Sequence, residues 1–171
     1  ELTVGGAPAP LFYAGGDQVN FQVPTTLQGN QWIRLTRAGG LRGLGLLLLQ
    51  SSPALFPVAT NQDGTVNDRT APAPRGRALT LYGSGAGWAA LPPDGEAAPR
   101  SGRPLYYTAA VPTVWVGNLR AQVLFSGLTP GLVGVWQINL VIPPAAPAGE
   151  AVAVRVLYDG IETNTITVVL R

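Results

Sequence analysis

The chain has 171 residues, of which only 12% are charged, and it is rich in glycine (22) and proline (16). All eleven basic residues are arginine, and nine acidic residues leave a formal net charge of +2. The lack of histidine and cysteine excludes Ser-His-Asp and Cys-His catalytic centres, histidine- or thiolate-ligated zinc and disulfides. A scattered charge of +2 is also too weak a field to indicate nucleic-acid binding.

The first fifty residues predict short strands separated by glycine turns. Strands are expected where apolar and polar residues alternate, and turns where glycine supplies a positive φ. The expected strands are Leu2–Val4, Ala9–Tyr13, Gln18–Val23, Gln31–Arg37 and Leu44–Gln50. The apolar run from Leu44 to Leu49 is much shorter than the roughly twenty residues that span a membrane. We interpret it as a strand that is buried on both faces.

The remainder of the chain predicts a connecting segment and a second series of strands. Residues 53–74 are expected to connect two modules and to turn at Asp63-Gly64, a dipeptide typical of β-hairpins. Residues 83–103 are rich in Gly, Pro and Ala and predict a long surface excursion. The expected strands are Ala78–Tyr82, Leu105–Ala109, Thr113–Val116, Gln122–Phe125, Val135–Ile142, Ala151–Leu157 and Thr163–Leu170. Short strands at this spacing are typical of a β-sandwich.

The two series repeat one another. The segment Gln18-Val19-Asn20-Phe21-Gln22-Val23-Pro24 returns as Gln137-Ile138-Asn139-Leu140-Val141-Ile142-Pro143, and both alternate polar with apolar residues before a proline. Three flanking segments match as well: Thr3–Gly6 with Trp115–Asn118, Leu11–Tyr13 with Val123–Phe125, and Ile33–Gly40 with Val154–Gly160. The sequence therefore predicts an all-β chain with modules at residues 1–52 and 75–171.

The order of these motifs resembles the uncharacterised C-terminal domain family named after Solibacter, over almost the whole chain. The motifs that carry the resemblance are Ala9–Tyr13, Gln18–Pro24, Pro53–Phe56, Asn61–Asn67, Leu81–Gly85 and Gly127–Asn139. The resemblance implies two immunoglobulin-like β-sandwich modules in tandem, at the C-terminus of large secreted bacterial proteins. It implies no activity.

The first module is expected to be incomplete, because it has no equivalents of the strands expected at Ala78–Tyr82 and Leu105–Ala109. Members of the Solibacter-type family usually carry further strands at this place. Three explanations stay open. Residues 54–58 and the hairpin after them fold back onto the first module, a neighbouring copy supplies a strand, or the chain is a trimmed piece of a longer one. An open sheet edge is a liability unless something pairs with it.

Few residues suggest chemistry. The acid pairs Asp94/Glu96 and Asp159/Glu162 are interpreted as solvated turn residues rather than a glycosidase pair. The loop Asn61–Asp68 is rich in side-chain oxygen but lacks the bidentate acid that closes an EF-hand loop, so we interpret it as a hairpin. We expect no catalytic residue, no metal and no cofactor.

Four tryptophans were considered as sugar contacts. Trp32, Trp115 and Trp136 lie within expected strands, where packing is the expected role. Trp88 lies in the surface excursion and is the candidate glycan contact.

These observations predict a non-catalytic, extracellular structural protein, a subunit of a cell-surface or extracellular filament assembled by β-strand complementation. The expected partners are other copies of the chain, with no nucleic acid and no membrane span. A chain that begins at Glu1 rather than Met is expected to be a processed, secreted product. The expected subunit-interface residues are Leu2, Val4, Leu46, Leu48, Leu55 and Phe56. The alternative is an adhesion or carbohydrate-binding accessory module that contacts a polysaccharide through Trp88.

Overall fold

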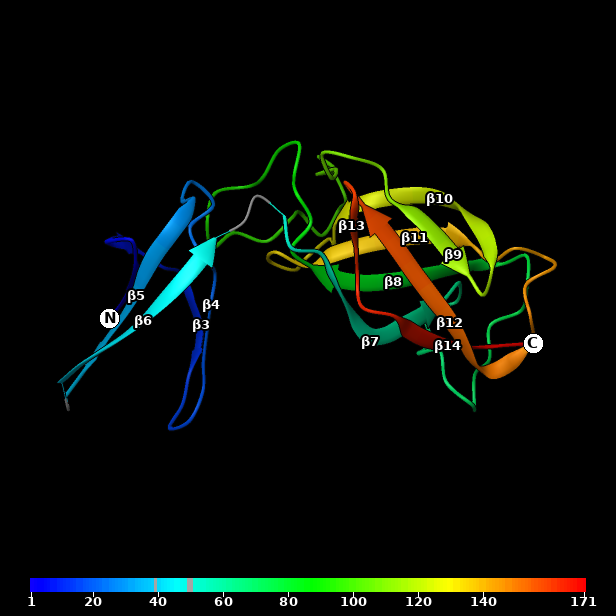
Figure 1. The fold of residues 1–171 in the computed structure, drawn as a ribbon, viewed down its shortest axis with the longest axis horizontal. Helices are drawn as coiled ribbons and strands as arrows, with labels where there is room; N and C mark the ends of the chain where they lie inside the picture. Colours follow the sequence, from blue (N-terminus) through cyan, green and yellow to red (C-terminus); the bar gives the residue numbers. More distant parts are fainter. Residues whose placement is uncertain (39, 49–50) are drawn as a thin grey trace. The chain divides into compact units, whose positions relative to one another are not determined.

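The computed structural model describes residues 1–38, 40–48 and 51–171, and these residues form strands and loops without a helix. The all-β prediction is therefore confirmed (Figure 1). The chain divides into two compact units, Glu1–Gln50 with Pro92–Ala97, and Ser51–Leu91 with Ala98–Arg171. No helix in the described part is long and apolar enough to cross a bilayer.

The first unit contains two small antiparallel sheets. One has the strand order β2-β1-β5-β6, and the other consists of β3 and β4. The strands are β1 (Leu2–Val4), β2 (Ala7–Pro8), β3 (Leu11–Ala14), β4 (Val19–Phe21), β5 (Gly29–Arg37) and β6 (Gly40–Leu48). Among the described residues, its buried core consists of Leu2, Val4 and Ala9, with partly buried apolar side chains from β4, β5 and the segment after β4 packed around them.

The second unit contains a sheet of order β13-β12-β9-β10-β11-β8-β7, curled into a half-barrel, and β14 pairs with β12 (Figure 1). The strands are β7 (Ala54–Asn61), β8 (Ala78–Ser84), β9 (Thr113–Val116), β10 (Leu119–Leu128), β11 (Trp136–Val141), β12 (Gly149–Tyr158), β13 (Ile161–Glu162) and β14 (Ile166–Leu170). Trp136 and Tyr158 are the largest fully buried side chains. Trp136 Nε1 donates to Ser126 Oγ at 2.9 Å, and Tyr158 Oη donates to the Gly87 carbonyl at 2.7 Å.

The repeat predicted from the sequence is present in the strand pairing. Val4 of β1 lies opposite Ile33 of β5, just as Val116 of β9 lies opposite Val154 of β12. The β1–β2 and β9–β10 hairpins both turn through a glycine with positive φ. The two units therefore share this part of their architecture.

The second half of the repeat matches even in an irregularity. The β3–β4 ladder pairs Leu11 with Phe21 and has a register shift immediately after that pair. The β10–β11 ladder pairs Val123 with Leu140 and shifts at the same place. The Gln/Asn strand also makes the same internal bond twice, from Gln18 Nε2 to Asn20 Oδ1 at 2.6 Å and from Gln137 Nε2 to Asn139 Oδ1 at 2.9 Å.

Three expectations differ from the structure. Residues 53–74 include β7, which pairs with β8 in the second unit rather than folding back onto the first. Residues 105–109 form no strand and contribute only isolated bridges, from Tyr107 to Gly127 and from Thr108 to Trp88. Leu44 is 64% exposed, so the prediction of a strand buried on both faces is wrong there. Its strand, β6, is the last of its sheet among the described strands.

Candidate functional site

The candidate site is the open side of the first unit, and the second unit shows what is missing there. In the second unit, β8 pairs with β11 from Trp136 to Val141. The counterpart of β11 in the first unit is β4, and within the described residues β4 pairs with β3 alone. Ile138 and Leu140 of β11 are completely buried, whereas the equivalent Val19 and Phe21 of β4 are only partly buried.

The other open edge belongs to β6, the counterpart of β14. β6 is the neighbour of β5, and β14 is the neighbour of β12, the counterpart of β5. Leu44 lies opposite Ile33 of β5, and Ile166 lies opposite the equivalent Val154 of β12. β6 pairs with β5 through all nine of its residues and has no second neighbour among the described strands. Its outer edge therefore presents unpaired backbone groups, which can template another strand.

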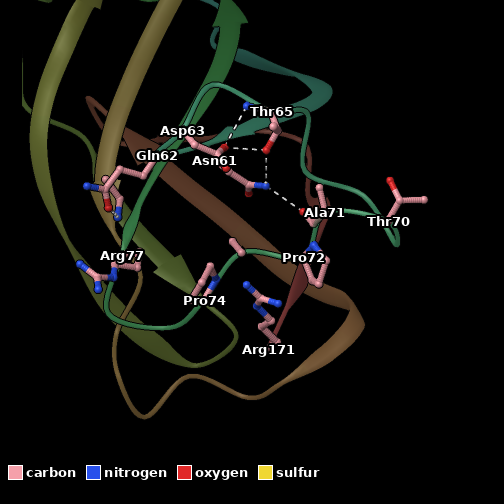
Figure 2. A pocket seen from close by; sticks show the side chains of 12 residues that line it. Asn61, Gln62, Asp63, Thr65, Thr70, Ala71, Pro72, Pro74, Arg77 and Arg171 are labelled. Carbon is pink, nitrogen blue, oxygen red and sulfur yellow. Dashed lines mark hydrogen bonds between the residues drawn. The ribbon is translucent and has the colours of Figure 1, made fainter.

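In contrast, the outer edge of β14 is covered by a loop segment and by the side chain of Asn67. The Ala73 amide donates to the Val169 carbonyl at 2.9 Å, and the Arg171 amide donates to the Ala73 carbonyl at 3.0 Å. Asn67 Nδ2 donates to the Val169 carbonyl at 2.9 Å, and the Val169 amide donates to Asn67 Oδ1 at 2.7 Å. Figure 2 shows the covering segment between Ala71 and Pro74 beside Arg171.

Asn164, which precedes β14, pairs in the same way with both backbone groups of one residue of β7. Its Oδ1 accepts from the Leu55 amide at 2.7 Å, and its Nδ2 donates to the Leu55 carbonyl at 3.0 Å. A side-chain amide offers one acceptor and two donors, so it can pair with both backbone groups of one residue as a neighbouring strand would. These asparagines tie β14 to the β7 region where no backbone ladder runs between them.

A cavity of about 500 Å³ opens between the two sheets of the first unit. Its apolar lining includes Leu11 and Val19 from one sheet and Leu35 from the other. An adjoining hollow of about 350 Å³ shares Leu35 and extends to Arg42. Both volumes lie within the roughly 300–1,000 Å³ of ligand-binding clefts.

Large apolar side chains are exposed in the described part of the first unit, and Leu11 among them lines the larger cavity. The exposed ones in the first unit are Leu11, Phe12, Tyr13, Trp32 and Leu44. Isolated exposed apolar residues are ordinary, but contiguous groups mark interaction sites. β3 exposes three of them in succession, so the open side of this unit has the character of a contact surface.

The predicted interface residues lie in different places. Leu2 and Val4 are buried in the first unit and Leu55 in the second, so their side chains leave no surface for a neighbour. Leu2 and Val4 are buried because partly buried apolar side chains, Val19 and Ile33 among them, pack against them. Phe56 is 38% exposed. The side chains of Leu46 and Leu48 lie outside the described residues.

The tryptophan predictions need one correction. Trp136 is fully buried, as expected for packing. Trp32 is 63% exposed, so its predicted packing role is wrong, because no layer covers the outward face of β5. Trp88, the predicted glycan contact, is partly buried and packs against the core of the second unit. Trp115 is partly buried on β9, with the Arg155 guanidinium 5.6 Å from its ring centre.

The hairpin interpretation of Asn61–Asp68 is confirmed. Thr60 bridges to Val66, and Gly64 supplies the positive φ of the turn. Asp63 Oδ1 accepts from both the hydroxyl and the amide of Thr65, and these hydrogen bonds lower the pKa of the Asp63 carboxyl. Asp68 is held in the same way by Thr70, first through its hydroxyl and then through its amide, and its pKa is lowered as well.

A hollow of about 540 Å³ lies beside this hairpin, lined among others by Asn61, Asp63, Arg77 and Arg171 (Figure 2). Asn61 is occupied within the hairpin, because its Nδ2 donates to Thr65 Oγ1 and to the Ala71 carbonyl. Across the described part of the chain, no three acidic side chains gather as a metal site would require.

In the acid pairs Asp94/Glu96 and Asp159/Glu162, both aspartates lie in turns, whereas Glu96 follows a turn and Glu162 belongs to β13. Asp94 accepts from the Thr25 amide at 3.1 Å within the first unit. Glu162 pairs with Arg155 at 3.7 Å on exposed strands. Neither pair is placed in one of the three cavities described above.

Comparison with protein-family models, with curated proteins and with solved structures finds no match for this chain. The similarity to the Solibacter-type family therefore stays a prediction from its motifs.

Proposed function

We propose that the protein is a non-catalytic structural subunit of a secreted or cell-surface filament, built from two immunoglobulin-like modules. Its copies associate by β-strand complementation, in which a strand of one copy completes the first module of the next. One observation carries this proposal. Among the described strands, β4 lacks the neighbour that β8 provides to its counterpart β11.

The energetics favour a strand at this place. A two-stranded sheet is marginal in water by itself, and β3–β4 is such a sheet. An added strand would pair with the backbone of β4 and place alternate apolar side chains beside Val19 and Phe21. Complete burial of one large apolar side chain stabilises by about 1.5–3 kcal/mol. Covering a few such side chains would therefore offset much of the entropy lost on association.

The second unit indicates which sequence pattern would fit. Leu79 of β8 lies opposite Leu140, and Leu81 lies opposite Ile138. Phe21 and Val19 occupy the equivalent positions of β4. A donated strand with apolar residues two positions apart would thus contact both. Donation from head to tail does not close on itself, so it generates a filament.

Light scattering after size-exclusion chromatography, together with negative-stain microscopy, tests the proposal. We expect assemblies that grow with protein concentration and that shorten when a peptide of residues 77–83 is added in excess. A peptide of the same composition in scrambled order is the control. A monodisperse monomer at high concentration contradicts the proposal.

A further inference from the structure

Two glycines of β6 have no function within their own unit. Gly43 lies opposite Arg34, and Gly45 lies opposite Trp32. Neither adopts the positive φ that favours glycine. A Cβ would meet nothing within 4 Å at Gly45, and only the Ile33 carbonyl oxygen at 3.7 Å at Gly43. Glycine inside a strand weakens it, and it often marks a site where another backbone or a ligand approaches closely.

The rest of β6 also indicates an approaching strand. Its outer edge is free among the described strands. Leu44, at its centre, is 64% exposed and lies on the face that Ile33 shares with the buried core. The backbone edge, the glycines and the exposed leucine all lie on the same strand.

We propose that β6 pairs antiparallel with β6 of a second copy, in the register that sets Leu44 opposite the partner's Leu44. This register pairs all nine residues, because Leu44 is the middle of Gly40–Leu48. It also sets Gly43 opposite the partner's Gly45. The inference rests on the proposed function in that both require copies of the chain to associate, and it names the strand that occupies the β6 edge.

The glycine pairs bring complementary side chains together on the outer face. One row across the joined sheet reads Trp32, Gly45, the partner's Gly43 and the partner's Arg34. Three strand spacings of roughly 4.8 Å separate the two outer residues by about 14 Å at Cα. Both side chains are long enough to extend over the bare glycines and meet as a cation–π pair. Symmetry repeats this contact, and Arg34 has no salt bridge among the described residues.

The opposite face and the charges agree with this register. Leu44 and the partner's Leu44 form an apolar cross-strand pair. Arg42 and the partner's Arg42 lie four residues apart along the strands, or about 13 Å. Charges at that distance are largely screened at physiological salt, where the Debye length is about 8 Å.

This symmetric contact occupies β6 on both copies and leaves the β4 edge free. The resulting dimer has two open β4 edges, one from each copy. Strand complementation at β4 can therefore join dimers into the proposed filament.

Disulfide cross-linking tests the register, because the chain contains no cysteine. Directly opposed residues have Cβ atoms about 4.5–5.5 Å apart, within reach of a disulfide after a small adjustment. Leu44→Cys should give a covalent dimer under mild oxidation, measured on non-reducing gels. Gly43→Cys and Gly45→Cys should each link poorly alone and form a mixed dimer when combined. Leu124→Cys, an equally exposed leucine of the second unit, is the control for random collision.

The outcomes separate the inference from the proposed function. Dimers that form with Leu44→Cys, in a protein that never assembles further, support the inference and contradict the filament. Assemblies that form while Leu44→Cys links no better than Leu124→Cys overturn the inference and leave the filament. Cross-linking of Gly43→Cys alone at the efficiency of Leu44→Cys also overturns it, because the register is then different. Circular dichroism of each variant confirms that it is folded.

Discussion

Replacing Asn164 with alanine tests whether a side-chain amide closes the edge of β7 at Leu55. In the native protein this amide satisfies both the N–H and the C=O of Leu55, at 2.7 and 3.0 Å. Leu55 is 4% exposed, so water has little access to these groups. The substitution removes both partners at once and leaves the two backbone groups unsatisfied.

The expected loss follows from these contacts. A buried polar group that loses its partner costs about 1–3 kcal/mol. Two such groups, with partial relaxation and some entry of water, give an expected decrease of about 2–4 kcal/mol in the free energy of unfolding. Asn164→Asp should fall between the wild type and Asn164→Ala, because a carboxylate still accepts from the Leu55 amide but cannot donate to its carbonyl.

Urea unfolding followed by tryptophan fluorescence measures this difference, since Trp136 is buried in the same unit. Asn118→Ala is the matched control, because Asn118 is exposed and makes no side-chain hydrogen bond within the described residues. Exposed substitutions of that kind usually change stability by less than about 0.5 kcal/mol. The reasoning is refuted if Asn164→Ala shifts the unfolding midpoint no more than Asn118→Ala does.

Three further predictions concern the second unit. Gly83→Ala should destabilise it by about 1–3 kcal/mol in the same urea assay, because the new Cβ collides with the Ala54 carbonyl oxygen, whereas Gly16→Ala meets nothing and should be neutral. Ser126→Ala should cost about 1–3 kcal/mol by leaving the buried Trp136 indole N–H without its acceptor, and an unchanged midpoint would contradict this. Asp63 and Asp68 have a lowered pKa in the folded state, so their contribution is complete above the unfolded value of about 4 and is lost as the pH falls through the lowered value. Replacing both with asparagine should flatten the acid side of a melting-temperature profile, and an identical profile would show that they contribute nothing.

Much of the strand pattern could be predicted because local chemistry determines it. Alternation of apolar and polar residues places Ile138 and Leu140 inward, and glycine marks the turns at Gly5 and Gly117. The internal repeat also indicates similar strand pairing in the two units, because segments of similar sequence form similar ladders. Even the shared register shift of β3–β4 and β10–β11 follows from it.

The errors arise where a neighbouring layer decides the outcome. The apolar residues Leu2 and Val4 do not reveal that β1 is an inner strand of its sheet. Leu44 likewise does not reveal that β6 is the last strand of that sheet. The presence or absence of a covering layer also explains why the exposure of two tryptophans differs from the prediction. Trp32 lies in a regular strand but has no layer over it, whereas Trp88 lies in an irregular segment that packs onto the core. Periodicity assigns residues to two faces and does not tell which face is covered.

β7 belongs to the second unit through its ladder with β8, and two asparagines add polar contacts at long range to this part of the chain. Asn67 and Asn164 bond to backbone groups 102 and 109 residues away. An asparagine near a turn usually indicates a local contact, so these long-range hydrogen bonds could not be predicted from the sequence. The alternation within Ala54–Asn61 predicted a strand but could not identify its neighbour.

Position 42 is one of the places where the two equivalent edges differ. Ile166 and Leu44 occupy equivalent places in their ladders, so Asn164 and Arg42, each two residues earlier, correspond. Asparagine both donates and accepts, and so pairs with a backbone N–H and C=O, whereas arginine only donates and cannot replace that pairing. Arginine at an open edge also opposes registers that bring two copies of itself together, because like charges directly opposite are destabilising. Of the symmetric pairings of β6, one centred at Arg42 sets the two guanidinium groups face to face, and one centred at Leu44 separates them by about 13 Å. Thus Arg42 limits how a second copy can pair with the β6 edge.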